Sequence, residues 1–298
     1  MQDFLLTLQA TRHPRTVDTA SVCLRPFLNY CEHHAIHTPD AFTRTHWLEF
    51  LHQTRQLDAS AWTIRNYARI ARQFLNWCER EGVLENNPSR TQDLPRKPEP
   101  NPQPLSLVQV RRLLDALNGS HWLEKRNYAL ALTLLDVGLR RSEALQMTVA
   151  DAYSGVIRVQ AKGGRFHTVF LAPETQLAIR RYLRAFTRHT GTALGEYEPL
   201  WRARNGQPLE ASGLRRVFSK VSTALGERVY PHRLRSTCAT LRLAVSGSPE
   251  MVRECLGHID RSSLEHYARL ASEDKARILR ETSPVNLLHN RKPREQRR

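Results

Sequence analysis

Arginine, histidine and tyrosine side chains follow one another in a distinctive order in the second half of the chain. Arg140 comes first, then His232 and Arg235, then His258, and Tyr267 stands nine residues after His258. His232 and Arg235 are three residues apart, so on a helix they project from one face. Arginine carries a planar fork of donors that can hold a phosphate through two bonds at once. Each residue alone is common on protein surfaces, but the ordered set is much more specific, and its arginines could hold a phosphate.

Helix ends are predicted next to each of these residues. Pro231 suits the first position of a helix over 232–245. Gly138 is expected to end a buried helix over 127–137, just before Arg140, and Gly257 can take the left-handed conformation that ends a helix over 249–256. Ser262 and Glu265 form a capping box for a short helix that carries Tyr267. The predicted helix ends therefore place Arg140 and His258 at turns, and His232 and Arg235 near the start of a helix.

A β-hairpin is predicted between these helices, over residues 155–171. Two runs with alternating apolar residues flank Lys162-Gly163-Gly164-Arg165, which is a turn signal. The hairpin places Lys162 at its tip, with Arg165 as a nearby basic alternative.

The remaining pattern is helical, so we expect a mainly α protein with a small antiparallel β-sheet in a second domain. In the N-terminal part, apolar stripes predict helices from Thr16, around Trp47 and from Ser60. After residue 105, Ser106 and Gln109 form a capping box for another helix. Further helices are expected over 173–189 and 212–225.

The predicted helix from Ser60 has a basic face made by Arg65, Arg69 and Arg72. This row could follow a DNA backbone. A solvated helix face explains the same pattern equally well, and periodicity alone leaves both readings open.

The charge of the chain is strongly positive and unevenly distributed. There are 45 Lys+Arg against 29 Asp+Glu, a formal net charge of +16, and only six of the basic residues are lysines. A GC-rich genome would explain the preference for arginine but not the excess of charge. Residues 93–104 contain five prolines, which favour an extended linker. Nearly all the excess charge, +15, follows residue 92, so the second part is expected to meet a polyanion.

Several function classes lack support. The five cysteines are far apart and form no Cys-x-x-Cys pair, which argues against a zinc finger and a disulfide framework and fits a reducing, cytoplasmic setting. No signal peptide, bilayer-spanning run, phosphate-binding loop or dinucleotide fingerprint is present, so neither a membrane partner nor a nucleotide cofactor is expected. His33 and His37 are four residues apart, but no downstream ligand is suitably spaced, and we expect no metal site.

The ordered motifs resemble those of the tyrosine recombinase family, also called the phage integrase family, and most closely its Xer-like members. The resemblance covers roughly residues 10–285. It implies a helical, SAM-like core-DNA-binding domain over 1–92, a linker over 93–105 and a catalytic domain over 106–285. The composition of the remaining segment, 286–298, predicts a basic tail that could touch DNA. The family often has a second histidine where this chain has Ser236.

The resemblance also implies an active site and a reaction. Tyr267 would be the nucleophile, forming a 3′-phosphotyrosyl link with DNA, and no cofactor would be needed. The other implied roles are a phosphate clamp (Arg140, Arg235), a general acid (Lys162), a general base (His232), a hydrogen bond to the phosphate (His258) and a support for the arginines (Glu143). Apart from the resemblance, the basic residues of the helix from Ser60 and of the hairpin are expected to contact DNA (Arg65, Arg69, Arg72, Arg165).

The implied function is site-specific recombination by a tetramer on two DNA duplexes, formed by this chain alone or with a related recombinase. The setting would be the cytoplasm, in association with the nucleoid. Two alternatives stay open from the sequence: a catalytically silent DNA-binding protein of the same fold, and a type IB topoisomerase-like enzyme that shares the chemistry without pairing two sites.

Overall fold

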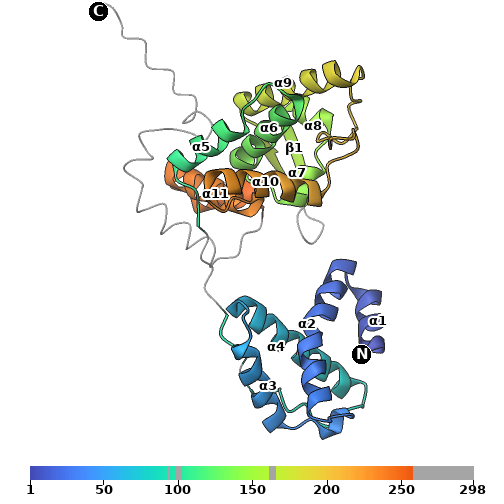
Figure 1. The fold of residues 1–298 in the computed structure, drawn as a ribbon. Coiled ribbons are helices and arrows are strands. Elements are labelled where there is room, and N and C mark those ends of the chain that lie inside the picture. Colours follow the sequence, from blue (N-terminus) through green and yellow to red (C-terminus); the bar gives the residue numbers. More distant parts are fainter. Residues whose placement is uncertain (93, 98–102, 161–165, 258–298) are drawn as a thin grey trace, which may run out of the picture. The chain divides into compact units, whose positions relative to one another are not determined.

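The computed structural model describes residues 1–92, 94–97, 103–160 and 166–257. The chain divides into two compact units, Met1–Glu99 and Pro100–Arg298 (Figure 1). Within the described residues, helices predominate and two strands form the one sheet. The expected fold class, mainly α with a small antiparallel sheet, is confirmed.

The first unit is a set of helices around an aromatic core. Phe27 lies at the centre of this core, with its ring edge-on to those of Phe42 and Phe50 at centroid distances of 5.0 and 5.2 Å. Such edge-to-face contacts are favourable for aromatic rings. The elements are α1 (Gln2–Thr11), α2 (Pro14–His33), a 3-10 turn (Pro39–Ala41), α3 (Arg44–Gln56) and α4 (Ala61–Arg80).

The second unit is built around one buried helix, α6 (Trp122–Val137), which packs against α5, α9 and α11. The elements around it are α5 (Leu107–Leu117), α7 (Arg141–Leu145), α8 (Val149–Ser154), α9 (Pro173–Thr190), α10 (Ala211–Leu225), α11 (Pro231–Ser246) and α12 (Pro249–Leu256). Every residue of α6 from Ala129 to Val137 is buried, which explains why this part of the helix is mostly apolar on all sides rather than striped.

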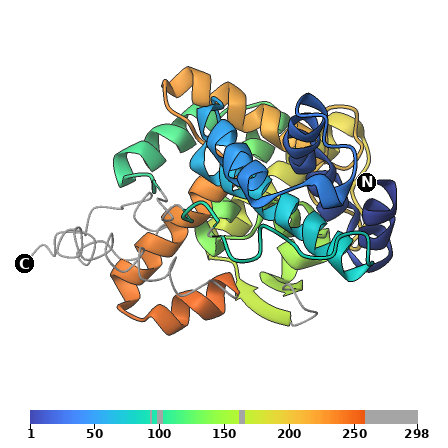
Figure 2. The same cartoon turned by 90° about the horizontal axis from the view of Figure 1, so that it is seen from below.

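The predicted hairpin is present as β1 (Val156–Gln160) and β2 (Phe166–Phe170), and β2 contacts α12 (Figure 2). Ile157 pairs with Val169 across the hairpin, and both side chains are buried in the core of the second unit. The predicted tip, residues 161–165, lies outside the described residues.

Helix boundaries differ from the sequence predictions in two ways. The helix expected over 127–137 begins five residues earlier because the Glu124 carboxylate caps the backbone N–H of His121 at 2.9 Å. Three helices were not predicted: α1, α7 and α8. The last two have five and six residues, too few to display a helical stripe, and α1 buries only Phe4 and Leu8.

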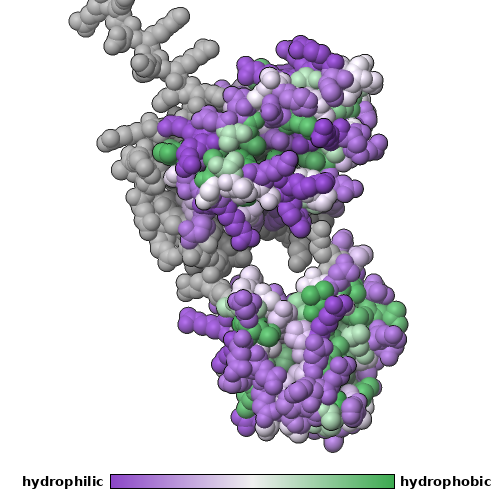
Figure 3. Space-filling model, in the orientation of Figure 1, coloured by the Kyte–Doolittle hydropathy of each residue, from purple (hydrophilic) through white to green (hydrophobic). Residues whose placement is uncertain are grey.

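The visible surface of each unit is mostly hydrophilic, with smaller hydrophobic areas between the polar residues (Figure 3). None of the described helices has the length and apolar character needed to cross a bilayer.

Gly138 ends α6 in the left-handed conformation, with φ 62° and ψ 31°. A Cβ atom added there would lie 2.2 Å from Leu256 Cδ2 and 3.1 Å from Cys238 Sγ. The glycine therefore provides both the backbone conformation and the space that bring α6, α11 and α12 together.

We expect Gly138→Ala to lower the free energy of unfolding by about 3 kcal/mol, combining the strain of a left-handed alanine with overpacking against Leu256. The control is Gly226→Ala, where φ is 65° and no atom lies within 4 Å of the added Cβ. This control should lose only about 1–2 kcal/mol. Urea unfolding followed by circular dichroism measures both, and equal losses would contradict the close packing at Gly138.

Candidate active site

Arg140 is fixed at the turn between α6 and α7 by a carboxylate three residues away. Glu143 Oε2 accepts a hydrogen bond from the Arg140 backbone N–H at 2.6 Å, and Glu143 Oε1 accepts one from Arg140 Nη1 at 2.6 Å. The Glu143 side chain is 8% exposed, whereas that of Arg140 is 38% exposed. The buried carboxylate thus holds both the backbone N–H and one guanidinium nitrogen of an arginine whose side chain is partly exposed.

Arg235 lies in the interior, where it joins three segments. Its Nη1 donates to the Gly138 carbonyl at 2.6 Å and its Nη2 donates to the Leu256 carbonyl at 2.5 Å. These are the carbonyls at the ends of α6 and α12, where helices leave backbone acceptors without helical partners. Arg235 is only 5% exposed, so its charge is held in a largely dehydrated position.

Glu143 also brings the two arginines into one cluster. Its Oε2 lies 3.8 Å from Arg235 Nη1, and its Oε1 bonds Arg140. One carboxylate between two guanidinium groups leaves the cluster with a net positive charge. A rigid cation of this kind is suited to the oxygens of a phosphodiester, because two arginines can present several N–H donors in a fixed geometry.

His232 stands on the first turn of α11, one turn before Arg235. The residue is exposed, yet the protein around it removes part of the hydration of the imidazole. This desolvation, followed by the positive charges of Arg235 and Arg140, lowers the pKa of His232 from its ordinary value of 6.5. The imidazole is therefore kept neutral near pH 7, which is the form that can accept a proton.

The structure thus brings together four of the predicted active-site residues: Arg140, Glu143, His232 and Arg235. The other four predicted residues of the second unit lie outside the described residues: Lys162, Arg165, His258 and Tyr267.

The backbone that leads to His258 is nevertheless constrained. Gly257 has φ 67° and ψ −174°, which is an extended conformation open essentially to glycine alone rather than the left-handed helical one that the sequence suggested. A Cβ at this position would lie 2.9 Å from His167 Cε1. Gly257 thus allows β2 to approach the end of α12 closely.

An ion pair between the buried Asp136 and the partly exposed Arg242, which sequence reasoning missed, supports the end of α6. Arg242 Nη2 donates to the Asp136 carbonyl at 2.5 Å and lies 3.7 Å from Asp136 Oδ1. Asp136 Oδ2 accepts from the backbone N–H of Ala172, at the start of α9, at 2.7 Å. Burial raises the pKa of Asp136, against the opposing effects of these hydrogen bonds and of Arg242. The one signal in the sequence was a carboxylate inside an apolar helix.

The arginine row on α4, in the first unit, has one exposed member and two members that bond backbone carbonyls. Arg69 is exposed. Arg65 Nη1 donates to the Pro95 carbonyl and Arg72 Nη2 to the Gln92 carbonyl, both in the segment that follows α4. The Arg72 guanidinium also lies 5.5 Å from the centroid of the Trp47 ring, a cation–π distance.

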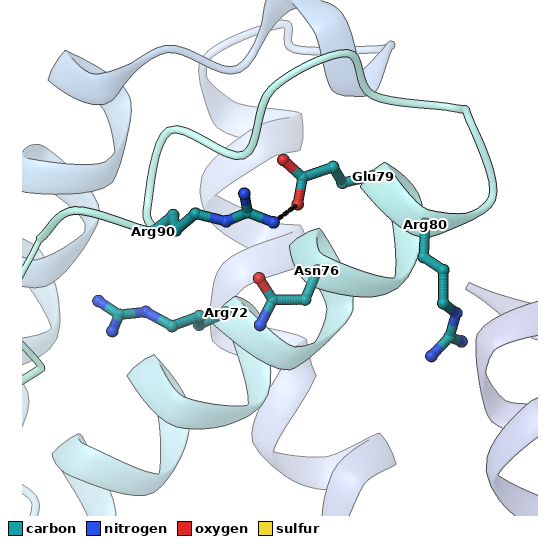
Figure 4. Close-up of a pocket in the computed structure, with 5 residues that line it drawn as sticks. All are labelled: Arg72, Asn76, Glu79, Arg80 and Arg90. Atoms are coloured by element: carbon teal, nitrogen blue, oxygen red, sulfur yellow. Dashed lines mark hydrogen bonds and ion pairs between the residues drawn. The ribbon is translucent and has the colours of Figure 1, made fainter.

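Arg72 also borders a basic cavity of about 560 Å³ in the first unit (Figure 4). In Figure 4, Glu79 holds Arg90 through a 2.7 Å ion pair, and Asn76 lies between Arg72 and Glu79. Arg80 completes the lining. Three arginines against one carboxylate make this part of the first unit locally positive.

Comparison with known proteins gives a consistent set of similarities. Residues 104–274 match the phage integrase family. The tyrosine recombinase XerC of Chromobacterium violaceum is 31% identical over 234 residues, covering 75% of this chain and 75% of that protein. The tyrosine recombinase XerC of Mesorhizobium japonicum is 30% identical, covering 94% of this chain and 97% of its own length.

Solved structures share the fold at lower identity. The XerH site-specific recombinase bound to palindromic difH substrate, a post-cleavage complex, has a TM-score of 0.67 at 23% identity and covers 88% of this chain and 78% of that chain. A lambda integrase dimer bound to a COC' core site has a TM-score of 0.70 at 16% identity and covers 90% and 93%.

We expect His232 to titrate below pH 6.5, as followed by the NMR shift of its ring Cε1–H, with His232→Gln identifying the signal. Arg140→Gln should raise this pKa, because it removes a positive charge that disfavours the imidazolium ion. Arg141→Gln removes the same charge one residue away and should leave the pKa nearly unchanged. A midpoint above 6.5, or equal shifts in the two variants, would contradict the described electrostatics.

Proposed function

This chain belongs to the phage integrase family and is a site-specific tyrosine recombinase, an enzyme that cuts and rejoins DNA strands, and we propose that Tyr267 is the residue that attacks the DNA. In this proposal the Tyr267 oxygen forms a bond to phosphorus, and the bond from phosphorus to the 5′ oxygen breaks. The products are a 3′-phosphotyrosyl link and a free 5′ hydroxyl. Attack by the 5′ hydroxyl of a partner strand reverses the step and exchanges the strands.

The observation that carries the proposed site is the arginine cluster around Glu143. Arg140 and Arg235 would hold the non-bridging oxygens of the phosphate, whose negative charge grows in the transition state. A pre-positioned donor of this kind typically contributes about 3 kcal/mol to transition-state stabilisation. Glu143 would not touch the phosphate; its part is to keep both guanidinium groups in place.

Two further residues are assigned proton transfers, and a third a hydrogen bond to the phosphate. A phenol has an ordinary pKa near 10, so Tyr267 needs a base, and the lowered pKa of His232 makes its neutral imidazole available for this. Lys162 would give a proton to the leaving 5′ oxygen. His258 would hydrogen-bond the phosphate, and Arg235 supports this role indirectly because it binds the carbonyl of Leu256, two residues earlier.

We also propose a role for each segment of the chain. Residues 1–92 would form the core-DNA-binding domain, 93–105 the linker, 106–285 the catalytic domain and 286–298 a basic tail. In the first domain, exposed Arg69 is the best placed of the α4 row for a phosphate contact, with Arg65 and Arg72 beside it. On the second domain, Arg165 would contact DNA near the hairpin tip.

DNA is the partner of the enzyme, and we propose that it works as a tetramer on two duplexes, alone or with a related recombinase. Association with the nucleoid follows from this role. Neither the silent DNA-binding protein nor the topoisomerase-like enzyme is favoured by the comparisons, since the relatives are recombinases.

A covalent trap tests the proposed nucleophile. The protein is incubated with nicked suicide DNA carrying its recombination site, identified by selecting bound genomic fragments. Loss of the short strand beyond the nick prevents religation, so the wild type should accumulate a protein–DNA adduct that survives SDS.

Tyr267→Phe should bind the same DNA without forming the adduct, because it lacks the attacking oxygen. An adduct that persists in Tyr267→Phe would show that another residue is the nucleophile. DNA binding without any adduct in the wild type would contradict the proposed cleavage chemistry.

A further inference from the structure

The exit of the interdomain linker is bonded directly to the helix that carries His232 and Arg235. Arg233 Nε donates to the carbonyl of Gln103 at 2.7 Å. Four residues further along α11, Thr237 Oγ1 accepts the backbone N–H of Leu105 at 2.8 Å. The same hydroxyl donates to the Arg233 carbonyl at 2.8 Å. Leu105 itself is 3% exposed and belongs to the core of the second unit, so the linker ends in a fixed position.

The Arg233 side chain is mostly buried, and its donors bond other parts of the protein. Its side chain is 12% exposed, and its Nη1 donates to the Arg228 carbonyl at 2.5 Å and lies 3.4 Å from Glu227 Oε2. Gln109, at the start of α5, donates to the same Glu227 oxygen at 2.6 Å. One network therefore joins the linker exit, the start of α5, the turn before α11 and α11 itself.

Arg233 is placed to act on the active site through α11. It lies between His232 and Arg235 in sequence, on the first turn of α11, and its side chain bonds the linker exit and the turn before this helix. The His232 and Arg235 side chains are three residues apart on one face, whereas Arg233 and Thr237 are four residues apart on another face. A pull on the linker would thus be transmitted to the helix turn that holds both proposed catalytic side chains.

The entrance of the linker is fastened in a similar way within the first unit. Arg65 and Arg72 bond the carbonyls of Pro95 and Gln92, and Leu94 packs against the core of that unit. Eight residue steps separate Pro95 from Gln103, so the chain between these two anchors can span at most about 28 Å, whatever its conformation. Anchored at both ends, the linker is a short tether.

We infer that Arg233 is a positioning residue that couples the interdomain linker to the catalytic helix α11, with Thr237 as the second anchor. Binding of the first unit to DNA then sets the tension of a tether whose far end, at Gln103 and Leu105, is bonded to the helix that carries His232 and Arg235. The inference rests on the proposed function, because it gives these two residues their roles in cleavage.

The first test measures single-turnover cleavage of the suicide DNA and its equilibrium binding. Arg233→Ala should lower the cleavage rate about tenfold, the order expected for a lost hydrogen bond to a charged group, with a DNA Kd within about twofold of the wild type. The matched control is Arg184→Ala, which removes one positive charge from an exposed position on α9 and should change neither quantity. An unchanged cleavage rate in Arg233→Ala would overturn the inference.

A second test separates coupling from a general loss of stability. Inserting Gly-Ser-Gly-Ser after Glu99 lengthens the tether and should also slow cleavage. If Arg233 acts by holding the tether, the insertion should slow Arg233→Ala no further. If the insertion slows Arg233→Ala by the same factor as it slows the wild type, the inference is overturned. The wild-type adduct is the reference in every measurement, so a failure of the proposed chemistry is seen in the wild type, and a failure of the coupling is seen only in the variants.

Discussion

The second unit depends on one buried electrostatic arrangement, the Glu143 carboxylate set between Arg140 and Arg235. A buried cation is costly unless charges and hydrogen bonds compensate it. Here Arg235 is compensated by Glu143 and by two helix-end carbonyls, those of Gly138 and Leu256. The same bonds that allow the charge to be buried also join α6, α11 and α12 at one point. The fold and the positive cluster are therefore consequences of the same contacts.

The residues around the arginine cluster fit this arrangement. Gly138 leaves room for Leu256, and Gly257 leaves room for His167, so the helix ends and the hairpin approach the arginines closely. The positive cluster also lowers the pKa of His232 and keeps it neutral. A phosphate placed at the cluster would meet donors that are already oriented and a base that is already deprotonated, which is the form of preorganisation that lowers a barrier most effectively.

Local signals in the sequence predicted much of the fold. The capping box at Ser106, the proline before His232 and the turn signal between the two predicted strands each act within a few residues, and the helices and strands that they predict are present. The contacts of Arg235 could not be predicted, because its carbonyl partners are 97 and 21 residues away. The same holds for Arg65 and Arg72, whose periodicity cannot distinguish a DNA-facing row from one bonded to carbonyls 30 and 20 residues further on.

The central claim, that Glu143 organises both arginines for cleavage, is tested most directly by Glu143→Gln in single-turnover cleavage of the suicide DNA. Glutamine keeps the size and one acceptor but removes the charge shared by Arg140 and Arg235. The cleavage rate should fall by at least about tenfold, the cost expected when a hydrogen bond to a charged group is weakened, while DNA binding is kept or strengthened. A variant that cleaves at the wild-type rate would show that the arginines hold their positions without the carboxylate and would contradict this account.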